Sequence, residues 1–314
     1  MTNQIKSLTL IVPCLNEENN ISSFMNRVLE IRENSPNINF RVMFVDDGST
    51  DNSRKVIRGL NKEYSGVDFI FLTKNFGSHL ALLAGLDSSL TDTAVFIPCD
   101  QPNHLSHTLK MLQYANEGIE VVIGENTNKN RKIASKFFSW VFYSLFNLVG
   151  DVKLPSGGAD FFLITKRPIE FLRKNKEYNT NVFMLLLWAE FKSTTLECEN
   201  IARTAERSKW TFAKRLRLAM DSFFGFSMAP LRFITIAGIF FSTTSFLFLA
   251  YTVWNYFFLG TPVPGIPTVV CTIAFGFGCM FLALGIIAEY LSRALDFSRN
   301  RPLFIIDEQN KNNN

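Results

Sequence analysis

The sequence predicts an α/β protein in which a doubly wound domain with a parallel sheet is followed by two membrane-spanning helices. Two observations lead to this prediction. Four short apolar runs near the start of the chain each end in polar residues, and helical patterns separate them. From Phe233 to Ala288 there is no charged residue, whereas the preceding sequence is an ordinary mixture. One soluble domain therefore precedes one membrane domain.

Composition narrows the class of protein further. With 314 residues, of which 47% are hydrophobic, the chain has ample material for a core. A formal net charge of +4 is too small to indicate nucleic-acid binding, and the basic residues gather beside the uncharged stretch, which favours lipid headgroups or phosphates as partners. The five cysteines share no metal-ligand spacing, and their odd number favours reduced thiols in a cytosolic domain.

The first two strands are expected at residues 8–12 and 42–45. The second ends at Asp46 and Asp47, followed by Gly48, which permits a tight turn into a helix that Ser49 or Asp51 can cap. An ordinary strand, turn and helix cap explains the glycine and the serine. Two adjacent carboxylates, however, repel each other and favour a site that supplies hydrogen-bond donors or a cation. The pattern supports both interpretations equally.

Two more strands are expected at residues 68–72 and 94–97, and polar residues follow each of them. Because the carboxyl ends of parallel strands meet at one edge of a sheet, ligands are expected there. Asp100 follows the fourth strand and can hold Mg²⁺ or Mn²⁺ together with diphosphate oxygens, with Gln101 as an additional candidate ligand. A lone aspartate at a strand end is, however, more often a turn residue.

Later polar residues carry weaker signals. Asp160 lies between a glycine turn and an aromatic strand, a position suited to an active-site carboxylate and, taken alone, more often to a simple turn acid. The three histidines have no second ligand at metal-site spacing, so they are interpreted as surface or helix-cap residues without a role: His79, His104 and His107.

Four motifs in order resemble the signatures of family-2 glycosyltransferases with the GT-A fold, a doubly wound, Rossmann-like architecture. They are Pro13-Cys14-Leu15-Asn16-Glu17-Glu18, Val45-Asp46-Asp47-Gly48-Ser49-Thr50-Asp51, Lys74-Asn75-Phe76-Gly77 and Ser208-Lys209-Trp210. With the apolar spans that follow, the chain is most similar to the membrane-anchored polyprenyl-phosphate glycosyltransferases of this family, which include dolichol-phosphate mannose synthases and undecaprenyl-phosphate glucosyltransferases.

The resemblance implies a nucleotide-diphosphate-sugar donor, a polyprenyl phosphate acceptor and an inverting transfer. The donor-binding residues it implies are Pro13, Asn16, Glu17, Asp46, Asp47 and Lys74. Asp100 becomes the metal-binding and catalytic acid and Asp160 a second catalytic residue. The acceptor phosphate is assigned to Arg203, Ser208 and Lys209.

The membrane part is expected as an interfacial helix and a transmembrane hairpin. Residues 1–209 form the cytosolic GT-A domain, 210–232 an amphipathic segment, 233–258 and 268–288 the spans, and 289–314 a cytosolic polar tail. Basic residues flank both ends of the hairpin, which puts both ends in the cytoplasm and makes the chain a multi-pass protein of the cell inner membrane. Segment 210–228 suits packing on the soluble domain equally well. Small residues such as Ala274 and Gly278 leave room for a homo-oligomer formed through these helices.

The function expected from the sequence is transfer of one sugar to undecaprenyl phosphate on the cytoplasmic face, for cell-surface glycans such as lipopolysaccharide. Such a phosphate is largely dianionic at neutral pH and needs little base catalysis, so Asp160 is expected to orient the acceptor or the sugar. Two alternatives stay open. One is elongation of a lipid-linked glycan at a hydroxyl, which requires a true base. The other is a non-catalytic membrane partner with a degenerate metal site.

Overall fold

In the computed structural model of the protein, the described residues are 5–89, 91–126, 161–175, 182–198, 229–259, 265–298 and 301–310. The chain divides into two compact units. One comprises Met1–Ala219 together with Pro302–Asn314, and the other comprises Met220–Arg301. The end of the chain therefore returns to the unit in which the chain begins.

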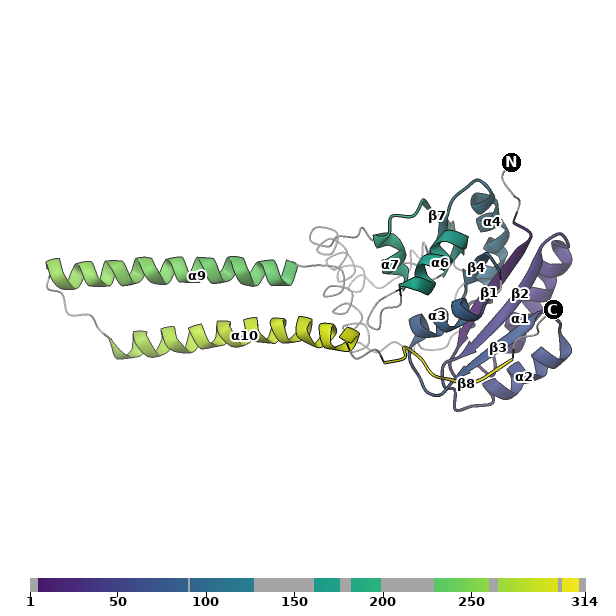
Figure 1. Ribbon diagram of the computed structural model, residues 1–314, viewed down its shortest axis with the longest axis horizontal. Helices are drawn as coiled ribbons and strands as arrows, with labels where there is room; N and C mark the ends of the chain where they lie inside the picture. The colour runs from purple at the N-terminus through teal and green to yellow at the C-terminus, as the bar shows by residue number, and fades with distance from the viewer. Residues whose placement is uncertain are drawn as a thin grey trace. The chain divides into compact units, whose positions relative to one another are not determined.

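The first unit is built on an eight-stranded mixed sheet with the order β7-β5-β6-β4-β1-β2-β3-β8 (Figure 1). Its strands are β1 (Ser7–Cys14), β2 (Asn39–Asp46), β3 (Val67–Leu72), β4 (Thr93–Phe96), β5 (Val121–Asn126), β6 (Phe161–Thr165), β7 (Ser193–Cys198) and β8 (Ile306–Asn310). The four strands expected from the sequence are β1 to β4, and they are parallel neighbours. The prediction of a wholly parallel sheet is wrong, because β6 runs antiparallel to β4 and β5, and β8 runs antiparallel to β3.

Helices cover both faces of this sheet (Figure 1). They are α1 (Ile21–Asn34), α2 (Ser53–Glu63), α3 (Ser78–Ser88), the 3-10 helix η1 (Pro102–His107), α4 (Thr108–Asn116), α6 (Lys166–Lys174) and α7 (Val182–Trp188). On α1 the buried side chains are those of Ile21, Phe24, Met25, Val28 and Ile31. Their spacing of three and four residues gives the helix one apolar face, which packs in the core.

Strand alternation divides the core between the two faces. Leu8, Leu10 and Val12 of β1 belong to the cluster that includes the apolar face of α1. Ile11 points the opposite way, toward α3, where a Cβ atom on Gly85 would lie 2.5 Å from its Cγ2 atom. The absence of a side chain at Gly85 therefore lets α3 lie close to the sheet.

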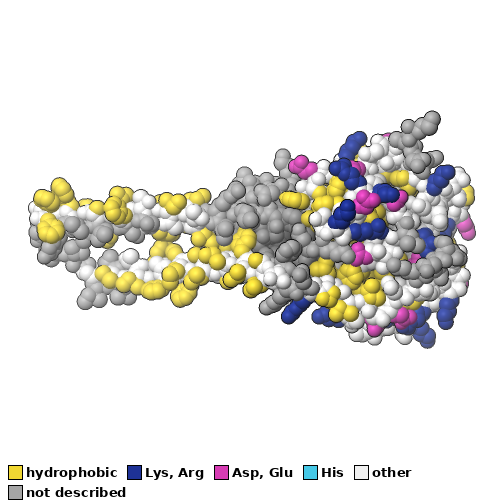
Figure 2. All heavy atoms as spheres, in the orientation of Figure 1, with side chains coloured by type: hydrophobic (Ala, Val, Ile, Leu, Met, Phe, Trp, Pro, Cys, Tyr) yellow, Lys and Arg dark blue, Asp and Glu magenta, His cyan; other side chains and the backbone are white. Residues whose placement is uncertain are grey.

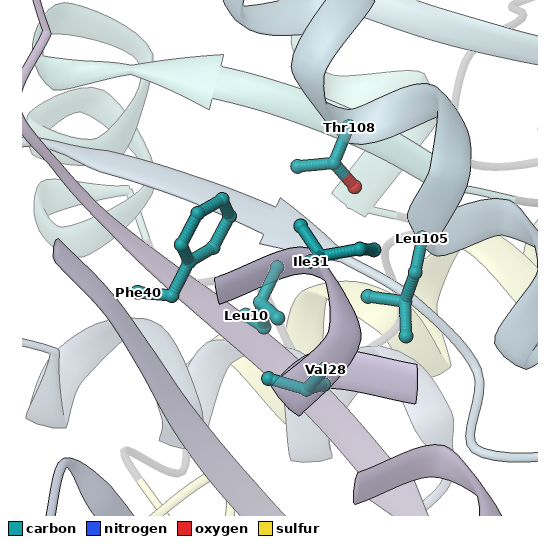
Figure 3. Close-up of a pocket in the computed structure, with 6 residues that line it drawn as sticks. All are labelled: Leu10, Val28, Ile31, Phe40, Leu105 and Thr108. Carbon is teal, nitrogen blue, oxygen red and sulfur yellow. The ribbon is translucent and has the colours of Figure 1, made fainter. Parts of the chain in front are cut away.

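A small gap remains in the core between α1, β1 and η1. Figure 3 shows the side chains around it, which are those of Leu10, Val28, Ile31, Phe40, Leu105 and Thr108. The gap has no room for a water molecule. The buried Oγ1 of Thr108 has no hydrogen-bond partner among the described residues. The gap is therefore a packing defect within the hydrophobic core, beside the Thr108 hydroxyl. It is too small for a ligand site.

The second unit contains two long apolar helices, α9 (Ala229–Trp254) and α10 (Ile266–Ser298), with a π-helical segment at Asn255–Leu259. Phe241 of α9 contacts Phe275 of α10 edge to face, with ring centroids 5.2 Å apart. Within the described residues, one window is long and apolar enough to cross a membrane, Phe275–Ser292, and α9 contributes the shorter apolar stretch Phe233–Phe248. Both predicted spans are helical, and their insertion as a hairpin stays a prediction.

Candidate functional site

The polar loops gather at the carboxyl ends of β1, β2 and β4. In the strand order β3-β2-β1-β4, the direction of chain progression reverses between β1 and β4. Such a reversal leaves a crevice beyond the strand ends, where ligands bind in open α/β sheets. Cys14 at the end of β1 is paired with Asp46 at the end of β2. The predicted donor residues of these two strands therefore lie at the same edge.

Asn16 links the loop after β1 to the loop after β2. Its backbone N–H donates to Ser49 Oγ at 2.9 Å, and its side-chain Oδ1 accepts from the backbone N–H of Thr50 at 2.8 Å. Asn16 has a φ of 55°, a left-handed conformation that asparagine tolerates better than most residues. The backbone N–H of Glu17 donates to Ser53 Oγ at 2.9 Å. Residues 16 and 17 therefore hold the two loops together.

A second set of bonds reinforces this link. Asp51 accepts from the backbone N–H of Glu18 at 3.2 Å and from that of Ser53 at 3.0 Å. Glu18 returns the contact by accepting from the backbone N–H of Asn52 at 2.9 Å. Burial raises the pKa of Asp51, but hydrogen bonds from Ser53 and Glu18 outweigh it, so the pKa lies below its ordinary value. Asp51 precedes the N-cap residue Asn52 and accepts from the first N–H of α2, that of Ser53, whereas Ser49 bonds to Asn16 and does not cap the helix.

Asp46 is fully buried and only half satisfied. Its Oδ1 accepts from the backbone N–H of Ser49 at 3.1 Å and from Arg54 Nε at 2.6 Å. Its Oδ2 is buried and has no hydrogen-bond partner among the described residues. A buried carboxylate oxygen without a donor is costly unless a ligand supplies the donor. Asp46 is therefore the clearest candidate for binding a ligand in the described part of the chain.

Asp47 has a different task from its neighbour. Its two oxygens accept from the backbone N–H groups of Phe76 and Gly77, at 2.7 and 2.9 Å. Burial raises its pKa, partly offset by these two bonds, and the charge of Asp46 raises it further. Lys74, at the start of this loop, is exposed, with Nζ 5.2 Å from the centre of the Phe76 ring. Asp47 thus places the loop that carries Lys74.

The loop after β4 lies beside β1. Cys99 is next to Cys14, where burial and contact with the Cys99 thiol raise the pKa of the Cys14 thiol well above its ordinary value. Asp100, the next residue, is exposed. Gln101 is buried, and its Oε1 accepts from Nε2 of His104. Asp100 is exposed and has a carboxylate, whereas Gln101 is buried and uncharged, so Asp100 is the better candidate ligand of the two.

The side chains at this edge can hold a divalent cation only if the substrate supplies some of its ligands. Among the described residues there is no group of three or more His, Cys, Asp or Glu side chains that could hold a metal by itself. Mg²⁺ commonly uses only one or two protein carboxylates and completes its shell with substrate phosphates and water. An exposed carboxylate at the sheet edge, as Asp100 provides, fits such a substrate-bridged ion.

Several predicted residues lie outside the described part of the chain. These are Asp160, Arg203, Ser208 and Lys209. The residues brought together at the edge are Pro13, Asn16, Glu17, Asp46, Asp47 and Lys74.

Two residues of the site region were missed by sequence reasoning. Arg54 follows Asp46 by eight residues, in the first turn of α2, and its position beside an acidic strand end was the available signal. His104 was interpreted as a surface or cap residue, which is wrong because it is 3% exposed and stacks on Phe161 with ring centroids 4.3 Å apart.

The comparison with known proteins agrees with this geometry. Residues 9–179, just over half of the chain, match the family described as Glycosyl transferase family 2. The chain is a family 2 glycosyltransferase. The match spans β1 to β4 together with the loops that carry every donor-binding residue predicted from the sequence.

Relatives of this glycosyltransferase align over nearly its whole length. An uncharacterized glycosyltransferase of Bacillus subtilis, YkcC, is 30% identical over 96% of this chain and 93% of its own. The SfII prophage-derived bactoprenol glucosyl transferase of Shigella flexneri is 29% identical over 98% of this chain and 99% of its own. Among solved structures, the mannosyltransferase PcManGT of Pyrobaculum calidifontis covers 96% of this chain and 89% of its own, with 14% identity and a TM-score of 0.48.

Proposed function

We propose that this glycosyltransferase moves one sugar from a nucleotide-diphosphate donor to a polyprenyl phosphate at the cytoplasmic face of a membrane. The observation that carries the proposal is similarity over the full chain. The Shigella flexneri relative is named for bactoprenol, a polyprenyl alcohol, and its alignment covers 98% of this glycosyltransferase. Similarity of that extent includes the apolar helices as well as the catalytic domain, so the same class of lipid acceptor is inferred here.

The surfaces of α9 and α10 support a membrane location. Large apolar side chains are exposed along both helices, among them Phe233 at 67%, Phe246 at 69% and Phe281 at 66%. Figure 2 shows hydrophobic side chains along these helices. So much apolar surface is unfavourable in water and is matched by hydrocarbon. If both helices cross the membrane as proposed, the basic residues at both ends of the hairpin would put both termini in the cytoplasm. A homo-oligomer formed through these helices stays a prediction.

The donor is proposed to bind at the edge that carries Asp46. Its Oδ2, which has no partner in the described part of the chain, suits an N–H or O–H donor of the nucleoside, and Pro13, Asn16 and Glu17 form the adjoining loop. Lys74 is proposed to contact diphosphate oxygens, and this is supported by the bonds through which Asp47 holds the Lys74 loop against the sheet edge. In this proposal Asp47 acts on the donor through that loop.

A Mg²⁺ or Mn²⁺ ion would be held by Asp100 together with the donor diphosphate, and it would neutralise charge that develops on the leaving group. Asp100 is suited to this task because it is an exposed carboxylate directly after β4, next to the Cys99 and Cys14 pair at the sheet edge. The positive charge of the Lys74 side chain would also stabilise the leaving diphosphate. Stabilisation of the leaving diphosphate is the main demand, since positioning and electrostatics dominate such transfers.

The transfer itself is proposed as a single displacement. A phosphate oxygen of the acceptor attacks the anomeric carbon, the bond from that carbon to the diphosphate oxygen breaks, and the nucleoside diphosphate leaves with the electron pair, so the anomeric configuration inverts. No proton must be removed, because the acceptor phosphate is largely dianionic at neutral pH. Asp160 is proposed to orient the acceptor or the sugar, and the acceptor phosphate is assigned to Arg203, Ser208 and Lys209.

The test is transfer by the purified full-length protein in detergent, with a panel of radiolabelled nucleotide sugars and undecaprenyl phosphate as acceptor. The expected product is a lipid-linked sugar phosphate formed from one donor, and Asp100→Asn should remove it. Undecaprenol, which ends in a hydroxyl, is the matched control and should not react. Transfer only to a hydroxyl-bearing lipid-linked glycan would overturn the acceptor assignment, and binding of neither nucleotide nor Mn²⁺ would point to a non-catalytic partner.

A further inference from the structure

The end of the chain forms part of the donor side of the sheet. Strand β8 pairs with β3, and the backbone N–H of Thr73, just after β3, donates to the carbonyl of Ile305 at 3.0 Å. The tail was expected to be a polar extension, and its sequence of exposed polar residues gave little sign of a strand. It covers the outer edge of β3, the strand next to the one that ends in Asp46.

A register shift in this pairing changes where the β8 side chains point. Leu72 is opposite Ile306 and Phe71 is opposite Glu308, which leaves Asp307 as the extra residue of a bulge. In a regular strand Asp307 and Glu308 would lie on opposite faces of the sheet. Here both bond to arginines one turn apart on α2, Asp307 to Arg54 and Glu308 to Arg58. Bulges re-aim side chains in this way, and they recur beside active sites.

All three nitrogens of the Arg54 guanidinium donate hydrogen bonds, and the three acceptors belong to three different strands, β2, β3 and β8. Nε donates to Asp46 Oδ1 at 2.6 Å, Nη2 to the carbonyl of Leu72 at 2.6 Å, and Nη1 to Asp307 Oδ2 at 2.9 Å. The guanidinium also lies over the ring of Phe71, 5.2 Å from its centre. A planar group held at three corners has one orientation, so the position of Arg54 Nε against Asp46 depends on the other two contacts.

We propose that Asp307 is a positioning residue of the donor site: by holding Arg54, it fixes the orientation of the buried Asp46 carboxylate that receives the nucleotide. This inference rests on the proposed donor site at Asp46. The Asp46 carboxylate is fully buried, and Arg54 is the cation that pairs with it. If Arg54 loses Asp307, its outer nitrogen turns to solvent and the Nε contact loosens. The segment that follows the last apolar helix thereby contributes to nucleotide binding.

Glu308 provides a matched control on the same strand. It pairs with Arg58, whose guanidinium also lies over Phe71, at 5.0 Å from the ring centre. The two ion pairs, Asp307 with Arg54 and Glu308 with Arg58, therefore share strand, helix, charge and aromatic neighbour. Arg54 is the more buried of the two arginines and also bonds to Asp46 and to the carbonyl of Leu72, whereas the guanidinium of Arg58 is more exposed and is bonded to Glu308. A loss of nucleotide affinity at Asp307 that exceeds the loss at Glu308, for a similar loss of stability, therefore distinguishes a positioning role from a purely structural one.

The experiment measures the Kd of nucleoside diphosphates, with UDP, GDP and ADP as probes, by calorimetry on the full-length protein in detergent. Asp307→Ala should weaken binding of the preferred nucleotide about two- to fivefold, the range for loss of one half-exposed ion pair. Glu308→Ala should leave the Kd within about 1.5-fold, and Asp307→Glu should restore part of the loss. The thermal midpoints of the two alanine variants should fall by similar amounts.

A double variant tests whether Asp307 acts on nucleotide binding through Arg54. Arg54→Lys keeps the positive charge but cannot hold Asp46 and Asp307 together, so adding Asp307→Ala to it should change the Kd no further. Equal losses in Asp307→Ala and Glu308→Ala, or a full additional loss in the Arg54→Lys background, would overturn the positioning role while leaving the proposed function standing. A wild-type protein that binds no nucleoside diphosphate would overturn the proposed function first, and this inference with it.

Discussion

A Cβ atom on Gly48 would lie 2.5 Å from the carbonyl carbon of Lys74 and 2.7 Å from the amide nitrogen of Asn75. This approach brings the loop after β3 against the turn after β2. Asp47, next to Gly48, accepts hydrogen bonds from Phe76 and Gly77 at the other end of the same loop. The absence of a side chain at Gly48 therefore allows two loops of the proposed donor site to approach closely, and the hydrogen bonds of the buried Asp47 carboxylate hold them there.

Gly48→Ala should destabilise the protein and weaken nucleotide binding more than about tenfold, because two effects combine at this position. Gly48 has a φ of 79°, which costs an L side chain about 1–2 kcal/mol, and the contact with Lys74 adds a steric clash. Gly118→Ala is the control, because Gly118 has a φ of 87° and a Cβ atom there would meet no described atom within 4 Å. Thermal midpoints and UDP titrations separate the two effects. Equal losses in both variants would show that backbone conformation alone matters at Gly48.

The parallel centre of the sheet was predictable, and its flanks were not. Strands β1 to β4 are apolar runs with polar ends, a pattern that local sequence carries. The antiparallel direction of β6 depends on how it meets β4 and β5 in space, and no local pattern encodes that choice. Strand β8 is mostly exposed and lacks an apolar run, because it lies at the sheet edge and is held by backbone pairing and ion pairs.

Thr108→Val should raise stability by about 1 kcal/mol, because it removes a buried hydroxyl that has no partner among the described residues and keeps the side-chain shape. Thr91→Val makes the same chemical change where the hydroxyl is paired, to Thr9 Oγ1 at 2.7 Å and to the carbonyl of Thr93 at 2.8 Å. That variant should lose about 1–2 kcal/mol. Thermal unfolding of both compares them directly, and a loss in Thr108→Val would mean that its hydroxyl is paired in solution.

Asp51→Asn should make stability less sensitive to acid. Burial raises the pKa of Asp51, but hydrogen bonds from Ser53 and Glu18 bring it below its ordinary value of 3.8. A carboxyl whose pKa is lowered by folding stabilises the protein above its unfolded pKa, and this contribution is lost as the pH falls through the folded pKa. The difference in thermal midpoint between wild type and Asp51→Asn should therefore be largest near pH ~7 and shrink below pH 3.8.

Glu33→Gln, at an exposed position near the end of α1, controls for loss of a negative charge. Its midpoint should follow that of the wild type across the same pH range. A difference between wild type and Asp51→Asn that stays constant from neutral pH to acid would assign the effect to packing and not to the ionised carboxylate.

At the candidate site, the sequence predicted which polar residues gather at the sheet edge, but it did not predict which contacts each of them makes. Asp46 and Asp47 are equivalent as sequence, yet one keeps a buried oxygen unpaired among the described residues and the other bonds two backbone N–H groups. That difference arises from the loop after β3, which is distant in sequence. His104 is similar, since its burial depends on Phe161 of β6. Packing between residues distant in sequence decides such roles, and a single sequence does not show which distant residues pack together.

Asp100→Asn should abolish retention of Mn²⁺ by the nucleotide complex and reduce turnover at least about a hundredfold. Asp100 is an exposed carboxylate after β4, and replacing it by an amide removes the charge that attracts a divalent ion. Asp92→Asn is the control, because Asp92 is an exposed acid just before β4 that pairs with Lys166. Electron paramagnetic resonance of Mn²⁺ with and without UDP gives a readout independent of activity. Equal Mn²⁺ affinity in both variants would remove Asp100 from the metal site.

Arg203→Ala and Lys209→Ala should each raise the acceptor KM about tenfold or more and leave donor binding nearly unchanged. Both residues precede the first apolar helix in a basic stretch, and a lipid-borne phosphate stays near the headgroup level. A charge-assisted contact to an anion contributes about 1.5–3 kcal/mol, which corresponds to a factor of about ten or more. Lys62→Ala removes an exposed charge from α2 and should change neither constant. Kinetics with donor and acceptor varied separately provide the measurement, and a loss of donor affinity equal to that of the acceptor would move the acceptor phosphate away from this stretch.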